Sequence, residues 1–256
     1  MRRYSKNITL LKNSRGIHSL DTVMGCASGT KDNKNGCYDD CYAAKGAARY
    51  GYDFSDYVLR EFKDEKHIES IIRKINKVDL PFIRVGTNGD PSEDWNHTLS
   101  ILEKLKGCDK QIVIITKHWL NISDEFLLKL NSLNIVINTS ISALDDEKVL
   151  ANSLVQYERL KPFCKSVLRI VTCDFNTYNP AGFRLATKQD ELIKIDENYI
   201  DTVFRPSKTN YLVKHNVINT TEKRFLKTKV LVSKLNKRTY FGGCANCKDL
   251  CGAKPQ

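Results

Sequence analysis

Short apolar segments alternate with longer amphipathic segments along most of this chain, and that order constrains its fold more than any other feature. The apolar segments are rich in β-branched residues and run into polar or glycine-containing loops, as buried strands do. Strands that alternate with helices predict a parallel sheet with right-handed crossovers. We expect one strand before or around the first cysteines and five after them, at 81–86, 111–117, 135–142, 166–173 and 201–206.

The segments between these strands carry helix signals. Residues 56–76 form an apolar stripe at helical spacing, and further helices are expected over 145–160 and 187–195. Ser92 and Ser123 are placed as N-caps of two more helices. About six βα units form either a partial barrel or a doubly wound sheet, and both place their sites at the carboxyl ends of the strands. Functional residues are therefore expected in the loops that follow the strands.

Composition narrows the setting of the protein. The chain has 256 residues, no apolar run long enough to span a bilayer and no signal-peptide pattern at its start, so we expect a cytoplasmic protein that needs no membrane. In a reducing compartment, nine cysteines point to metal ligation or thiol chemistry before disulfides. The net charge of +11 fits a nucleic-acid or nucleotide partner, although lysines spread evenly along the chain also fit an AT-rich genome.

Six of the nine cysteines form two groups of three at opposite ends of the chain. Cys26, Cys37 and Cys41 form the first trio, and Cys244, Cys247 and Cys251 form the second. Three thiolates in a polar, glycine-rich loop suit an iron–sulfur cluster with one open coordination position. A structural zinc site would need a fourth ligand for each trio. Cys108 and Cys164 are expected to be incidental.

The first trio lies in the segment MGCASGTKDNKNGCYDDCYAAKG, directly before the alternating pattern. This order resembles the radical SAM enzymes, in which three cysteines hold a [4Fe–4S] cluster and S-adenosylmethionine (SAM) chelates the fourth iron. The spacing C-x10-C-x3-C departs from the common C-x3-C-x2-C and is similar to divergent, phage-type members. The resemblance implies a partial (β/α)6 barrel over 1–210, a C-terminal extension over 211–256, and a flavodoxin or ferredoxin as reductant.

The resemblance also assigns a SAM site to the strand ends. The loop after the strand 81–86 corresponds to the place where the family holds the methionine group, although it also reads as a plain turn. Tyr42 would supply an aromatic wall for adenine. The residues assigned to this loop are Gly86, Thr87, Asn88, Gly89 and Asp90.

Polar residues inside apolar strands point to the same site. Thr116 and Lys117 end one strand, and a buried Arg169 would require an anion such as the SAM carboxylate, with a salt bridge to a neighbouring acid as the alternative. Arg205 gives weaker support to the same need for an anion. Cys173 ends a strand, where its thiol could meet substrate or simply be buried as a small apolar group. Asn138, Ser140 and Ser142 alternate along one strand and share a face.

The second trio, in GGCANCKDLCGAKPQ, is open to three interpretations. It could hold an auxiliary [4Fe–4S] cluster, half a zinc site or free thiols. The resemblance favours the auxiliary cluster, with a role in substrate binding or sulfur transfer. The sequence thus predicts a radical SAM enzyme acting on a nucleic acid, nucleotide or peptide. The alternative is a non-enzymatic, zinc-binding nucleic-acid-binding protein.

Overall fold

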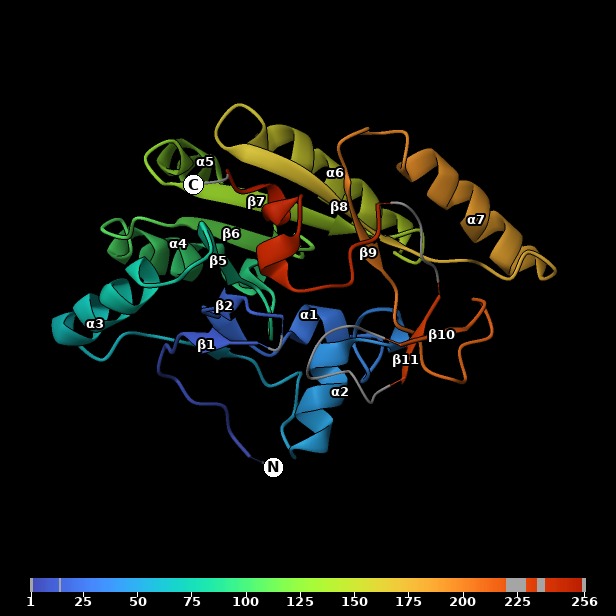
Figure 1. The fold of residues 1–256 in the computed structure, drawn as a ribbon, viewed down its shortest axis with the longest axis horizontal. Coiled ribbons are helices and arrows are strands. Elements are labelled where there is room, and N and C mark those ends of the chain that lie inside the picture. The colour runs from blue at the N-terminus through green and yellow to red at the C-terminus, as the bar shows by residue number, and fades with distance from the viewer. Residues whose placement is uncertain (1, 14, 220–228, 234–237, 255–256) are drawn as a thin grey trace.

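The central element is a seven-stranded sheet that curls into an open half-barrel (Figure 1). The computed structural model describes residues 2–13, 15–219, 229–233 and 238–254. Strand β1 pairs antiparallel with β2, and all later strands of this sheet run parallel to β2. The spatial order is β1 (Leu11–Lys12), β2 (His18–Ser19), β5 (Phe82–Val85), β6 (Gln111–Thr116), β7 (Ile135–Ile141), β8 (Lys165–Thr172) and β9 (Ile200–Val203).

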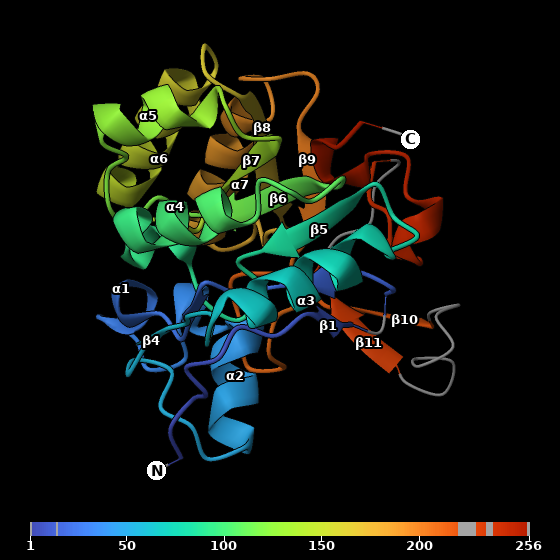
Figure 2. The same ribbon diagram turned by 90° about the vertical axis from the view of Figure 1, so that its left-hand side faces the viewer.

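All five strands predicted after the first cysteines are present, and β2 is the sixth parallel strand. The helices that connect β6 to β9 lie along the outer side of the curve, and the C-terminal tail lies on its inner side (Figures 1 and 2). The curled sheet agrees with the predicted partial barrel. The helices that follow the first cysteine trio and its helices α1 (Ala27–Thr30) and α2 (Tyr42–Arg49) are α3 (Glu65–Asn76), α4 (Trp95–Lys104), α5 (Asp124–Leu130), α6 (Glu147–Leu160) and α7 (Pro180–Leu192).

Three helix boundaries differ from those predicted. Helix α3 begins only after Asp64, whose carboxylate caps it, and the residues before it form strand β4 (Val58–Leu59) with β3 (Val23–Met24). Asp94, not Ser92, caps α4. Helix α7 starts earlier than expected because Asn179 caps it ahead of a proline at its first position. The cap predicted at Ser123 is confirmed.

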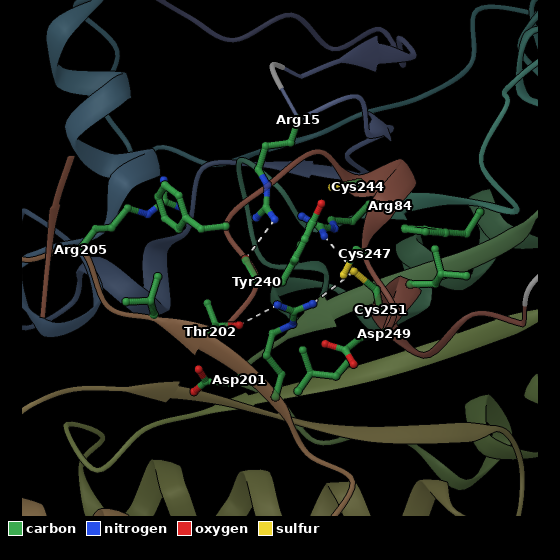
Figure 3. A pocket seen from close by; sticks show the side chains of 16 residues that line it. Arg15, Arg84, Asp201, Thr202, Arg205, Tyr240, Cys244, Cys247, Asp249 and Cys251 are labelled. Atoms are coloured by element: carbon green, nitrogen blue, oxygen red, sulfur yellow. Dashed lines mark hydrogen bonds between the residues drawn. The ribbon is translucent and has the colours of Figure 1, made fainter. Parts of the chain in front are cut away.

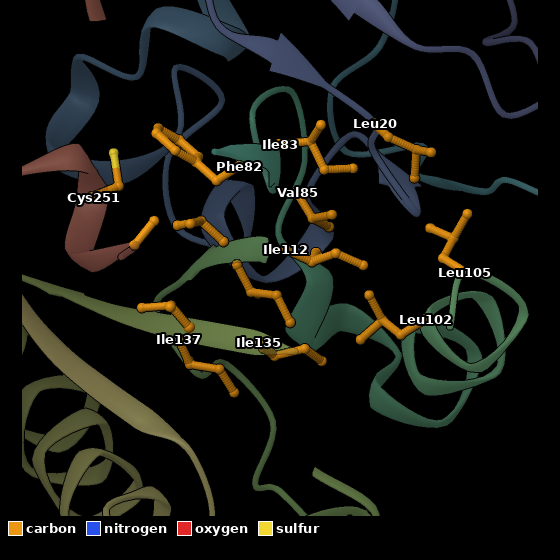
Figure 4. Packing of buried hydrophobic residues seen from close by; sticks show 14 of the residues in the cluster. Leu20, Phe82, Ile83, Val85, Leu102, Leu105, Ile112, Ile135, Ile137 and Cys251 are labelled. Carbon is orange, nitrogen blue, oxygen red and sulfur yellow. The ribbon is translucent and has the colours of Figure 1, made fainter. Parts of the chain in front are cut away.

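One apolar cluster joins the sheet, its outer helices and the C-terminal tail (Figure 4). Ile83, Val85 and Ile112 from the strands are buried with Leu102 of α4, and Cys251 of the tail belongs to the same cluster. The tail is thus packed into the core of the sheet. The remaining strands, β10 (Asn216–Asn219) and β11 (Lys229–Val232), form a separate hairpin. No helix among the described residues is long and apolar enough to cross a membrane.

Candidate iron–sulfur sites

The first cysteine trio lies at the carboxyl edge of the sheet, against the loops that follow β5 and β6. Gly25, which precedes Cys26, forms a bridge with Gly89 of the β5 loop. Cys26 caps the short helix α1 (Ala27–Thr30), and its sulfur accepts the N–H of Gly29 at 3.3 Å. Cys41 stands at the N-cap of α2 (Tyr42–Arg49). The side chain of Cys41 makes no capping hydrogen bond, so it is not held by the helix start as the Cys26 sulfur is.

Two glycines allow cysteine side chains to approach their backbone closely. A Cβ atom on Gly29 would lie 2.8 Å from the sulfur of Cys26 and 3.4 Å from that of Cys37. A Cβ on Gly36 would lie 2.6 Å from the Cβ of Cys41. The sulfurs of Cys26 and Cys37 therefore both face Gly29, and a side chain at that position would collide with the Cys26 sulfur.

An unpartnered indole lies beside Gly29. The Trp119 ring comes within 3.5 Å of the position of a Gly29 Cβ, and its Nε1–H is buried without a hydrogen-bond acceptor among the described residues. A buried donor without an acceptor is costly, so a polar or sulfide-bearing group belongs next to it. Three neighbouring thiols with an orphaned donor beside two of them fit a bound inorganic cluster.

Glu93 is a residue at this site that the sequence did not single out. The Cys26 thiol donates to its Oε1 at 3.2 Å, and Ser28 binds both of its oxygens through N–H and hydroxyl groups. Only 7% of Glu93 is exposed. Its position three residues after Asp90, in the same loop, is the one sequence signal that could have identified it.

The environment keeps two of these thiols protonated as long as nothing binds them. Burial raises the pKa of Cys26, and the nearby Asp90 and Glu93 carboxylates raise it further. Burial also raises the pKa of Cys37 to about 12, although the Lys117 ammonium opposes the shift. Metal ligation requires thiolates, so binding must release these protons.

Lys117 anchors the first trio to the sheet. Its ammonium lies 2.6 Å from Asp145 and donates to the Tyr38 hydroxyl at 2.5 Å. Lys117 and Asp145 are both almost fully buried. Tyr38 follows Cys37 directly and adopts a left-handed backbone conformation with φ of 61°. The Lys117 cation thus holds the segment that carries Cys37.

The β5 loop is held by hydrogen bonds within the protein. Asp90 accepts from the Thr116 hydroxyl at 2.6 Å, from Lys117 N–H at 2.8 Å and from Ser92. Asp21 accepts the N–H groups of Thr87 and Asn88. A Cβ on Gly86, where φ is +87°, would lie 2.2 Å from a β6 carbonyl, and one on Gly89 would lie 2.3 Å from the Val23 carbonyl. These residues therefore shape the loop beside the trio.

The second trio lies on the inner face of the sheet (Figure 3). Arg84 of β5 and Arg169 of β8 donate to the Cys251 sulfur at 2.9 Å and 3.3 Å. Asn138 of β7 donates to the Cys251 carbonyl and accepts from Arg169. Burial would raise the pKa of Cys251, but the two guanidinium groups outweigh it and the net shift is downward.

The structure divides the predicted SAM residues between the two trios. The β5 loop, Thr116 and Lys117 lie at the first trio. Arg169 and Arg205 line the cavity of the second trio, and Asn138 donates to the Cys251 carbonyl beside it. Tyr42 lies between them: its hydroxyl donates to the Thr87 carbonyl, and it interacts electrostatically with Cys41, Arg84 and Arg205.

The remaining predicted residues have structural contacts. The carbonyl of Ser140 accepts from the Lys117 ammonium at 3.4 Å. Ser142 donates its N–H to the Asp145 carboxylate, and its carbonyl accepts the Asp145 N–H. Cys173 follows β8 in a buried apolar cluster, where its backbone pairs with Gln189. Among the described residues, no group of three or more Cys, His, Asp or Glu is close enough to hold a single metal ion.

No protein-family model matches the chain, and no curated protein or solved structure matches it. The case for function therefore rests on the residues and their arrangement.

Proposed function

We propose that this protein is a radical SAM iron–sulfur enzyme in which Cys26, Cys37 and Cys41 hold a [4Fe–4S] cluster. The observation that carries the proposal is that the Cys26 and Cys37 sulfurs both face Gly29, beside the orphaned Trp119 Nε1–H, at the carboxyl edge of a half-barrel. When bound, such a cluster supplies the single electron that cleaves SAM reductively. A cytoplasmic flavodoxin or ferredoxin would be the electron donor.

The residues of the chain itself would position the ligands. Glu93, buried next to Cys26, offers a carboxylate for the amino group of SAM, and Asp90 holds the loops after β5 and β6 in register. Tyr42, which is 60% exposed and donates its hydroxyl to the Thr87 carbonyl, would offer its ring to the adenine of SAM. Trp119 offers a donor that has no partner among the described residues. Together these groups would orient SAM and exclude water.

The second trio would hold an auxiliary cluster. Arg84 and Arg169 donate to Cys251, and hydrogen bonds to sulfur together with nearby positive charge stabilise an anionic cluster and raise its reduction potential. The donor set fits a negatively charged inorganic group. A substrate bound on the inner face would contact this second site.

The proposal is tested by anaerobic reconstitution with iron and sulfide, followed by SAM and dithionite. We expect broad absorption near about 400 nm and release of methionine and 5′-deoxyadenosine. Cys26→Ala should abolish SAM cleavage, because it removes a ligand of the SAM-binding cluster. Cys251→Ala should leave cleavage of SAM without substrate measurable, because it changes only the auxiliary site.

Cys164→Ala is the matched control, since Cys164 precedes β8 at the opposite edge of the sheet. It should cleave SAM as the wild type does. Zinc bound in place of iron, with no SAM cleavage after reconstitution, would support the zinc-binding alternative and contradict the proposal.

A further inference from the structure

The cavity at the second trio contains more positive charge than its own residues neutralise. Four arginines line it, Arg15, Arg84, Arg169 and Arg205, and none of them forms an ion pair with a carboxylate in the part of the chain that the structure describes. Two acids also line the cavity, and one of them, Asp201, accepts from two threonine hydroxyls. Arg15, Arg84 and Arg169 are partly buried, and Arg205 is exposed. Partly buried guanidinium groups without counter-charges are costly, and the exposed Arg205 adds a further positive charge, so the cavity calls for an anion.

The four arginines divide into two pairs (Figure 3). Arg84 and Arg169 point to the Cys251 sulfur and serve the cysteine trio. Arg15 donates only to the Gly242 and Tyr240 carbonyls, and Arg205 forms no hydrogen bond to any described residue. The second pair thus keeps donors that the sulfur atoms do not use.

Arg15 and Arg205 line the same cavity, and Arg15 lies close enough to disfavour the charge of Arg205. Burial lowers the pKa of Arg205, and the Arg15 cation lowers it further, although Tyr42 opposes the shift. An anion bound between the two guanidinium groups would attract both and offset their mutual repulsion. Guanidinium pairs bind phosphate oxygens in a bidentate manner, which a lysine cannot do.

The aromatic rings and the size of the cavity narrow the class of anion. The Arg205 guanidinium lies 5.9 Å from the centre of the Phe241 ring, and Arg15 lies at the same distance from the Tyr240 ring. The cavity volume of about 60 Å³ suits a phosphoryl group rather than a whole nucleotide, because one water takes roughly 10–15 Å³. A base outside the cavity could stack on the aromatic rings.

We propose that Arg15 and Arg205 form a subsite for the phosphate group of a nucleotide-type substrate. This inference rests on the proposed function only in naming the substrate class, because phosphate binding is measurable whether or not SAM is cleaved. It departs from the sequence-based assignment of Arg205 to the SAM carboxylate. The net charge of +11 agrees with a polyanionic substrate.

The test is equilibrium titration of the reconstituted protein with adenosine 5′-monophosphate, adenosine and a single-stranded oligonucleotide. The monophosphate should bind at least about tenfold tighter than adenosine, since one charge-assisted contact is worth about a factor of ten. Arg205→Gln should remove that advantage, and Arg205→Lys should restore part of it. Monophosphate binding alone indicates a free nucleotide as the source, and tighter oligonucleotide binding that also depends on Arg205 indicates nucleic acid.

Arg73→Gln on the exposed face of α3 is the charge-matched control and should bind as the wild type does. Equal affinity for monophosphate and adenosine, or unchanged binding in Arg205→Gln, would overturn the proposal. So would a SAM affinity that falls as much as the monophosphate affinity in this variant, because SAM would then be the anion. If the protein binds the monophosphate but takes up no iron, the phosphate subsite is supported and the radical SAM proposal fails. If the protein cleaves SAM but does not bind the monophosphate, the radical SAM proposal is supported and the phosphate subsite fails.

Discussion

At the scale of single residues, the first trio depends on a glycine as much as on its cysteines. Gly29 is the residue whose missing side chain lets the Cys26 and Cys37 sulfurs approach the backbone closely. The sequence identified the thiols because their spacing is visible, but it did not identify Gly29, Glu93 or Trp119. Their roles arise from contacts between loops that are distant in the chain.

Gly29→Ala should block iron binding at the first trio, because its Cβ would lie 2.8 Å from the Cys26 sulfur. We expect reconstituted iron per chain to fall by about half, with the second trio still loaded. Gly46→Ala is the control, since a Cβ at that position meets nothing within 4 Å in helix α2. That variant should keep its iron and gain up to about 1 kcal/mol in unfolding free energy. Full iron in Gly29→Ala would count against the first site.

His118 should make stability fall in acid. Burial lowers its pKa from 6.5 to about 3, and its Nε2 lies 2.9 Å from the Thr139 hydroxyl. Between these values the unfolded chain binds a proton that the folded chain excludes, so the unfolding free energy rises with pH in that range. The slope is roughly 1 kcal/mol per pH unit.

His118→Asn tests this slope by denaturant titration at several pH values. Asparagine tolerates the φ of 54° at this position and does not titrate. The variant should lose less stability than the wild type between pH 6 and 4 (roughly the range in which a free histidine gains its proton). An unchanged slope would mean that other groups cause the acid sensitivity.

At the scale of elements, the alternating pattern predicted the sheet well and the helix starts less well. The strands β5 to β9 stand out because they are apolar and β-branched, which is a local property. The start of α3 was missed because the segment before it carries similar apolar residues but pairs as β4 with β3. That pairing is long-range and leaves no periodic signal.

Asp90 joins the loop after β5 to the end of β6, and Asp90→Asn should loosen both. An amide nitrogen would replace one acceptor oxygen, facing either Lys117 N–H or the Thr116 and Ser92 donors. The loss of buried acceptor bonds should lower the unfolding free energy by about 2 kcal/mol, measured by denaturant titration. Asp109→Asn, outside this network in the loop before β6, should change little; a similar loss there would mean that Asp90 has no special role.

Asp145→Asn should be more damaging, because it leaves the Lys117 ammonium buried without its counter-charge. Breaking such a buried pair should lower the unfolding free energy by about 3–5 kcal/mol. The segment that carries Cys37 should also lose its anchor, the hydrogen bond from Lys117 to Tyr38. The comparison is Glu125→Gln, which breaks the exposed Lys129 pair and should leave the midpoint of thermal unfolding unchanged. Equal effects of the two substitutions would contradict the anchoring role of Lys117.

At the scale of the whole molecule, the half-barrel carries two cysteine trios that come from opposite ends of the sequence. The first trio lies at the carboxyl edge of the strands and the second on their inner face, with Tyr42 between them. The sequence predicted both trios and the polar strand residues, but it assigned Arg169 and Asn138 to the SAM site. Only the path of the tail places them at Cys251.

The most direct measurement of this account is the iron and sulfide content of anaerobically reconstituted protein. Wild type should bind about eight irons per chain, and replacing Cys26, Cys37 and Cys41 together, or Cys244, Cys247 and Cys251 together, by alanine should each leave about four. If each triple variant keeps half of the iron, the protein has two independent cluster sites on one half-barrel. A wild-type protein that binds zinc but no iron, or loses all iron in either triple variant, would contradict it.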